Sequence, residues 1–189
     1  MNIFVLCTGR SGSVTFYNVC KHIKNYTTGH ESRKNLDIVF PDNHIEIDNR
    51  LSWFLGTLNE NFGNDAIYVN LRRNKYEVAK SYSKRFYYRR GITKGFKYNL
   101  LHSSQRLNKS DYDICLDMVQ TMENNINFFL ENKSKKVEVN VENFENDIPK
   151  FWRYINAEGD INLALNELNI KYNPTKKSII KKIKNYLYK

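Results

Sequence analysis

A short apolar run that enters a glycine-rich turn constrains the fold of this chain more than any other feature of its sequence. Residues 3–7, Ile-Phe-Val-Leu-Cys, are followed by Thr-Gly-Arg-Ser-Gly-Ser and then by apolar residues at helical spacing. This order predicts a buried strand, a tight turn and a helix over 14–26. At the carboxyl edge of a parallel sheet, the N–H groups of such a turn and the helix dipole favour phosphate or sulfate.

Strands and helices are expected to alternate along the rest of the chain. The predicted strands lie at 36–40, 66–71 and 136–141, and the predicted helices at 48–62, 75–89, 110–129, 151–155, 161–168 and 175–188. A polar loop is expected over 27–35, and Gly91 and Gly95 indicate another loop after the helix at 75–89. We therefore expect one α/β domain over 1–189, with a central parallel sheet flanked by helices.

Composition narrows the class of protein. A hydrophobic content of 41% argues against disorder, and no apolar run reaches the roughly 18 residues of a membrane span, so we expect a cytoplasmic protein without a transmembrane segment. A net charge of +10 favours anionic partners: nucleic acid, charged polysaccharide, a membrane surface or a phosphorylated small molecule; a merely solvated basic surface is the alternative. The three cysteines and four histidines lack metal-ligand spacing, so no metal is expected.

The glycine-rich turn matches neither common nucleotide-binding pattern. In the pattern G-x-x-x-x-G-K-[ST] the second glycine would fall at Val14, and no Lys-Ser or Lys-Thr pair follows. The pattern G-x-G-x-x-G is absent as well. Gly9 and Gly12 nevertheless allow close approach of the backbone to an anion, and the hydroxyls of Ser11, Ser13 and Thr15 add donors. A tight turn with a purely structural role is the alternative.

A second candidate anion site follows the predicted strand at 66–71. Arg72 and Arg73 come next, and Ser81 lies eight residues beyond Arg73, about two turns into the following helix. An arginine at the carboxyl end of a strand and a hydroxyl on the next helix can hold one phosphate from two sides. The spacing therefore predicts a phosphate site made by Arg73 and Ser81.

Together the two motifs resemble the sulfotransferase family that uses 3′-phosphoadenosine-5′-phosphosulfate (PAPS), in the style of its bacterial and carbohydrate-modifying members. Gly-Arg-Ser-Gly-Ser at 9–13 is similar to the family's 5′-phosphosulfate loop. Arg-Asn-Lys-Tyr-Glu-Val-Ala-Lys-Ser-Tyr at 73–82 is similar to its 3′-phosphate motif, although Lys75 stands where proline is common.

Shorter segments add to this resemblance. Gly-His-Glu-Ser at 29–32 and Asp-Asn-Arg-Leu-Ser-Trp at 48–53 look like segments of bacterial members, and 139–144 is faintly similar to a Tyr-Glu-Asp-Leu segment of the family. Beyond about residue 100 the match is thin, and the family's Arg-Lys-Gly motif is not seen near the C-terminus.

The resemblance implies a P-loop NTPase-like sulfotransferase fold and metal-free, in-line transfer of a sulfuryl group from PAPS to a hydroxyl or amine. The acceptor would be a small molecule or carbohydrate, and the desulfated product is PAP. The residues implied to bind the donor are Arg10, Ser11, Gly12, Ser13, Val14, Thr15, Arg73 and Ser81. Arg10 would also neutralise charge on the leaving phosphate oxygen.

The acceptor proton needs a base, and three residues are candidates. Glu31 is the first, because it falls in the loop after the first helix; His30 is the second and His44 the third. The alternative for Glu31 is an ion pair with Arg33 or Lys34 on a solvated loop.

Two other functions are alternatives to sulfuryl transfer. Residues 84–98 interleave basic and aromatic side chains as single-strand RNA binders do, although on the sulfotransferase interpretation this stretch is a lid or an acceptor-facing loop. A nucleotide phosphotransferase is the second alternative, against which the missing Lys-Ser pair counts. The basic helix predicted at 175–188 suits a membrane surface or partner, or a solvated tail.

Overall fold

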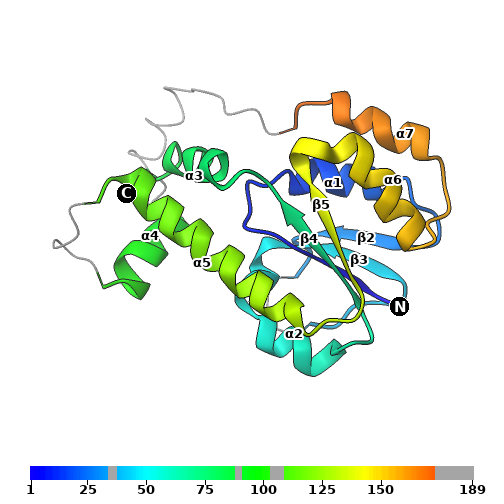
Figure 1. Ribbon diagram of the computed structural model, residues 1–189, viewed down its shortest axis with the longest axis horizontal. Coiled ribbons are helices and arrows are strands. Elements are labelled where there is room, and N and C mark those ends of the chain that lie inside the picture. The colour runs from blue at the N-terminus through cyan, green and yellow to red at the C-terminus, as the bar shows by residue number, and fades with distance from the viewer. Residues whose placement is uncertain (34–37, 88–90, 103–108, 173–189) are drawn as a thin grey trace.

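A five-stranded sheet forms the centre of the computed structural model, which describes residues 1–33, 38–87, 91–102 and 109–172. The strands lie in the order β2-β3-β1-β4-β5 (Figure 1). They are β1 Ile3–Leu6, β2 Thr27–His30, β3 His44–Ile47, β4 Ile67–Arg72 and β5 Lys136–Asn140. Each of their pairings is parallel, which confirms the predicted α/β class with helices around a parallel sheet.

The central strand β1 lies where the direction of chain winding changes. Ile3 pairs with Ile45 of β3 on one side and with Ile67 of β4 on the other. The chain first builds β2 and β3 on one side of β1 and then crosses to build β4 and β5 on the other. In sheets of this kind the connections diverge at the carboxyl end of such a strand and leave a crevice for a ligand.

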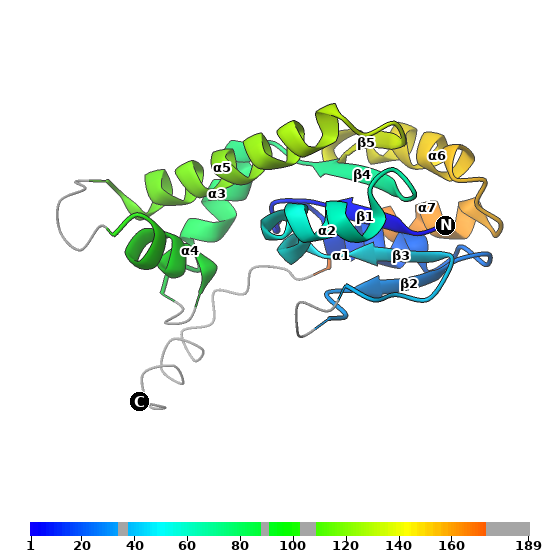
Figure 2. The same ribbon diagram turned by 90° about the horizontal axis from the view of Figure 1, so that it is seen from below.

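Helices cover both faces of the sheet (Figures 1 and 2). The α-helices are α1 Ser13–Cys20, α2 Leu55–Phe62, α3 Lys75–Ser83, α4 Ile92–Gly95, α5 Asp111–Glu131, α6 Phe144–Tyr154 and α7 Ile161–Asn166. Shorter 3₁₀ turns lie at Asn49–Trp53, Val141–Asn143 and Glu167–Asn169, and a π-helical turn at Phe96–Leu100.

Successive side chains of β1 point to opposite faces of the sheet, so β1 contributes to a separate core on each face. Ile3 and Val5 join a core with buried residues of α1, α6 and α7, whereas Phe4 and Leu6 join another with α2 and the C-terminal half of α5. All four side chains are fully buried because β1 is covered on both faces, as in other parallel sheets.

A third core extends away from the sheet and supports the region beyond α3. Val78 and Tyr82 of α3 pack there with Phe96 and with the N-terminal half of α5, including Ile114 and Met118. Figure 2 shows α4 beside this half of α5, away from the strands. α5 begins as predicted, because Ser110 and Asp113 form a capping box at its N-terminus.

The structure corrects two expectations about strands. Residues 27–30 form the edge strand β2 rather than a polar loop, since backbone pairing with β3 needs no apolar side chains. The neighbouring strand is β3 rather than a strand at 36–40; residues 38–40 have no regular structure and 34–37 lie outside the described residues. β3 was not predicted because it carries the polar residues His44 and Glu46, which are nevertheless buried as a hydrogen-bonded pair.

Helix boundaries also differ from those expected. α1 ends at Cys20 and α3 at Ser83, each well before the predicted end. The region 48–62 is a 3₁₀ turn followed by α2, and α6 begins at Phe144 rather than at 151. Residues 92–95 form α4 instead of a loop. The helix predicted at 175–188 lies outside the described residues.

Among residues 1–33, 38–87, 91–102 and 109–172, no helix has the length and apolar character needed to cross a bilayer.

Candidate functional site

The turn between β1 and α1 has a backbone suited to holding an anion. Gly9, Arg10 and Gly12 all adopt positive φ angles, of 73°, 56° and 79°. Glycine adopts this left-handed region freely, which accounts for two of the three positions. The turn delivers the chain into α1, whose first-turn N–H groups have no acceptor within the helix and carry the positive end of its dipole.

Contacts from two other segments fix this turn in place. The Tyr82 hydroxyl of α3 donates a buried hydrogen bond of 2.7 Å to the carbonyl oxygen of Thr8. Ser52 Oγ donates one of 3.0 Å to the carbonyl oxygen of Cys7. A Cβ added at Gly9 would lie 2.3 Å from the Tyr82 hydroxyl and 3.3 Å from Asn49 Cγ. The turn is therefore packed closely enough that only glycine fits at residue 9.

Two buried groups lie beneath the turn. The side chain of Ser11 is fully buried and adjoins the thiol of Cys7. Burial raises the pKa of the Cys7 thiol to about 11, so it is protonated at neutral pH and is no nucleophile. Ser11 is also the one predicted donor-binding residue that does not line the pocket described next.

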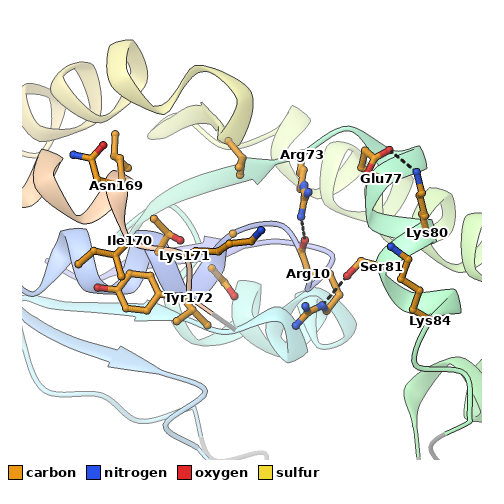
Figure 3. A pocket seen from close by; sticks show the side chains of 16 residues that line it. Arg10, Arg73, Glu77, Lys80, Ser81, Lys84, Asn169, Ile170, Lys171 and Tyr172 are labelled. Carbon is orange, nitrogen blue, oxygen red and sulfur yellow. Dashed lines mark hydrogen bonds and ion pairs between the residues drawn. The ribbon is translucent and has the colours of Figure 1, made fainter. Parts of the chain in front are cut away.

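The two predicted anion motifs meet in one pocket of about 470 Å³. Arg10, Gly12, Ser13, Val14 and Thr15 line it from the first motif, and Arg73 and Ser81 line it from the second (Figure 3).

Direct hydrogen bonds link the two motifs across this pocket. Arg73 Nη1 donates to the carbonyl oxygen of Arg10 at 3.0 Å, and Arg10 Nε donates to Ser81 Oγ at 3.1 Å (Figure 3). Seven of the eight predicted donor-binding residues therefore lie around a single cavity.

Positive charge dominates the pocket. Its cationic lining residues are Arg10, Arg73, Lys80, Lys84 and Lys171. The carboxylate among the lining residues is Glu77, which pairs with Lys80 at 3.6 Å. Burial, together with the nearby charges of Arg85 and Arg73, lowers the pKa of Arg10. A guanidinium that is partly desolvated and surrounded by like charges gains from an anionic ligand.

The first two base candidates lie beside the pocket and not in its lining. His30 ends β2, and its Nε2 is 3.2 Å from Oγ of Ser13, which does line the pocket. Glu31 follows with a positive φ of 49°, and its backbone N–H donates to the carbonyl oxygen of Ile47 at 3.0 Å. Its carboxylate accepts a hydrogen bond of 2.5 Å from Asn49 Nδ2. Both residues thus lie at the carboxyl edge of the sheet, as the pocket does.

The alternative ion pair between Glu31 and Arg33 is not found in the described residues. The Arg33 guanidinium instead lies over the ring of Phe40, at 4.9 Å, and Lys34 lies outside the described residues. His44, the third base candidate, occupies the opposite, amino end of β3. Its ring nitrogens contact Thr27 Oγ1 at 2.8 Å and the carboxylate of Glu46 at 2.9 Å, which leaves it no role at the pocket.

Glu46 anchors the loop that carries Glu31. It is fully buried, and its carboxylate accepts hydrogen bonds from the N–H and hydroxyl of Ser32 at 2.9 and 2.6 Å as well as contacting His44. Burial by itself would raise the pKa of Glu46, but the hydrogen bonds from His44 and Ser32 outweigh it and lower the pKa. A buried carboxylate thereby fixes the residue that follows Glu31.

Several pocket residues were missed by the sequence analysis. Lys80 and Lys84 stand one helical turn apart and flank Ser81, a spacing that could have placed them on the same face of α3. Residues 169–172, including Lys171, come from the far end of the described chain, and no local pattern marks them. Within the described residues, no group of three or more His, Cys, Asp or Glu side chains is arranged to hold a metal ion.

Comparison with known proteins gives no relatives. No family model, curated protein or solved structure matches this chain.

Proposed function

We propose that this protein is a sulfotransferase with a P-loop NTPase-like fold, which moves a sulfuryl group from PAPS to a hydroxyl or amine of a small-molecule or carbohydrate acceptor. One observation carries the proposal: a single basic pocket unites the turn at 9–13 with Arg73 and Ser81. A ligand with two separate anionic groups suits this arrangement. In PAPS these are the 5′-phosphosulfate, assigned to the turn, and the 3′-phosphate, assigned to Arg73 and Ser81.

The size and charge of the pocket support this donor. Its volume of about 470 Å³ is in the range of small-molecule sites, roughly 300–1,000 Å³. Five cationic side chains against one carboxylate favour a ligand that carries several negative charges.

The transfer itself forms one bond and breaks another. The acceptor oxygen or nitrogen attacks sulfur in line, while the bond between sulfur and the bridging oxygen breaks and leaves PAP with a new negative charge on its 5′-phosphate. The N–H groups at the start of α1 and the hydroxyls of Ser13 and Thr15 orient the phosphosulfate. Arg10 stabilises the charge that develops on the leaving oxygen.

Arg10 has to change partners during this reaction. Its Nε is hydrogen-bonded to Ser81 Oγ, on the side of the pocket assigned to the 3′-phosphate. When the 3′-phosphate engages Ser81, Arg10 exchanges this bond for one to the 5′-phosphosulfate. Binding at one end of the donor thus frees the side chain that acts at the other end.

Glu31 is the proposed base that accepts the acceptor proton. Its carboxylate lies at the carboxyl edge of the sheet and is oriented by Asn49, which packs against Gly9 of the turn. His30 is the second candidate, since its ring adjoins Ser13.

The nucleic-acid alternative has less support in the structure than in the sequence. Phe86 and Phe96, two aromatic residues of the stretch 84–98, are buried in the core beside α5. Lys97 lies over the rings of Phe86 and Tyr98, and its amino group is 3.8 Å from Asp111. The buried rings of Phe86 and Phe96 are therefore poor stacking platforms for RNA bases, whereas Tyr98 is exposed.

Calorimetric titration of PAP at two salt concentrations tests the donor site. We expect one-to-one binding by the wild type and loss of binding in Arg73→Ala and Ser81→Ala. Arg72→Ala is the matched control, because Arg72 is exposed, pairs with Glu138 at 3.1 Å and does not line the pocket. Failure of the folded wild type to bind PAP refutes the proposal. Turnover that requires Mg²⁺ and ATP would favour the phosphotransferase, and salt-sensitive RNA binding the nucleic-acid module.

A further inference from the structure

Residues 169–172, here called the strap, form the wall of the pocket that faces α3. All four strap residues line the pocket. In Figure 3 the amino group of Lys171 extends from the strap toward the side of the pocket that holds Arg10 and Arg73. The strap thus places the amino group of Lys171 opposite the arginines of the two motifs, although the strap lies at the far end of the described chain.

Few backbone bonds hold the strap. Beyond the 3₁₀ turn that ends at Asn169, its backbone bonds within the described residues run from Ile170 N–H to the carbonyl oxygen of Glu167 and from Tyr172 N–H to that of Ile170, each 3.1 Å long. The opposite walls are built on α1 and α3, which are regular helices packed in the cores. Asn169, Ile170 and Lys171 are exposed, so burial does not fix the strap either.

Three side chains tie the strap to α1. The Tyr172 hydroxyl donates to one carboxylate oxygen of Glu167, and the other carboxylate oxygen lies 2.9 Å from Nε2 of His22. His22 comes two residues after the end of α1, the helix whose other end carries the anion-binding turn. Hydrogen bonds from His22 and Tyr172 lower the pKa of Glu167, which keeps its carboxylate ionised at neutral pH.

We propose that His22, Glu167 and Tyr172 form a latch that positions the strap, and with it Lys171, against the donor pocket. This inference rests on the proposed function, since the ligand whose affinity it governs is PAPS or PAP. The three residues act as positioning residues: the hydroxyl of Tyr172 is committed to Glu167, and Lys171 is the side chain that reaches toward the anion. Without the latch, the strap loses its fixed position and the affinity for the donor falls.

A double-mutant cycle with PAP as the titrant tests this role. Tyr172→Phe removes only the hydroxyl, and we expect it to raise the Kd for PAP by about three- to tenfold, the usual effect of one hydrogen bond. Lys171→Ala should weaken binding by at least as much. In the Lys171→Ala background, Tyr172→Phe should have almost no further effect, because the latch acts through Lys171.

Controls separate positioning from general destabilisation. Tyr154→Phe, at an exposed tyrosine of α6 outside the pocket, should leave the Kd unchanged, and the melting temperatures of Tyr172→Phe and Tyr154→Phe should agree. Unchanged PAP affinity in Tyr172→Phe overturns the latch while wild-type binding, and so the proposed function, stands. Additive effects of Tyr172→Phe and Lys171→Ala also overturn it. Loss of PAP binding by the wild type itself refutes the proposed function and the latch together.

Discussion

Replacing Glu46 by alanine is the most demanding test of how the edge of the sheet is built. The Glu46 side chain is completely buried on β3, and its carboxylate is bonded to Ser32 through two donors and to His44 through a third. Glu46→Ala removes the acceptor for all of them at once. Ser32 is also the residue next to Glu31, so the same change frees the loop of the proposed base.

The expected loss of stability is large. A hydrogen bond to a charged group typically contributes about 1.5–3 kcal/mol, and Glu46→Ala removes three such bonds and leaves a ring nitrogen of the buried His44 without its partner, so we expect a loss of about 3–5 kcal/mol. For a chain of this length each kcal/mol lowers the melting temperature by roughly 2–4 °C, so Glu46→Ala should melt about 6–20 °C below the wild type. Glu46→Gln keeps the shape and one acceptor oxygen and should lose only about 1–3 kcal/mol.

Urea unfolding followed by circular dichroism measures these differences. Glu60→Ala serves as the control, since Glu60 is an exposed residue of α2 and should change stability by no more than about 0.5 kcal/mol. The slope of the unfolding free energy against urea should be the same for all variants. If Glu46→Ala loses less than about 1 kcal/mol at an unchanged slope, the buried hydrogen bonds of Glu46 do not stabilise the sheet edge.

Three further predictions follow from the same structure. The pKa of Glu46 is lower in the folded state, so the stabilisation by its carboxylate is complete above the unfolded pKa of about 4.3 and is lost as the pH falls through the folded pKa. The difference in melting temperature between wild type and Glu46→Gln should therefore shrink toward pH 3. A difference that becomes larger on acidification would contradict this. Gly9→Ala should abolish PAP binding and cost more than about 1 kcal/mol by thermal melting, because its Cβ would lie 2.3 Å from the Tyr82 hydroxyl. Gly56→Ala, in the first turn of α2 where an added Cβ meets open space, should instead stabilise by about 0.5–1 kcal/mol. Ser110→Ala should lower the free energy of unfolding by about 1 kcal/mol in urea titrations through loss of the capping box of α5, and an unchanged value would show that this helix end needs no cap.

The sequence predicted those parts of the fold in which pattern and environment agree. β1 and β4 are apolar runs covered by helices on both faces, and α5 combines an N-terminal cap with apolar residues at helical spacing. β2 and β3 were not predicted because their polar side chains are more typical of exposed loops than of strands. Thr27 and Thr28 sit on an edge strand held by its backbone, and His44 and Glu46 are polar yet buried because each satisfies the other.

The candidate site likewise contains residues that the sequence could place and residues that it could not. Arg10, Arg73 and Ser81 could be placed near one another from sequence, since each follows the carboxyl end of a predicted strand. Lys171 could not, because it reaches the pocket from the far end of the described chain, next to a segment where Glu167 contacts His22 across 145 residues of chain. A contact between residues so far apart in the sequence cannot be predicted from the local spacing of residue types.

The register between β1 and β4 determines how far apart the two candidate anion-binding segments lie. Leu6 pairs with Asn70, and neighbouring strands in a sheet are about 4.7–4.9 Å apart. The distance between the chain segments that carry Arg10 and Arg73 is therefore determined by the sheet and not by the loops. A site built on such a frame selects its ligand by the distance between two charges. Sequence changes in the loops around the pocket can therefore occur while the spacing of these two charges stays the same.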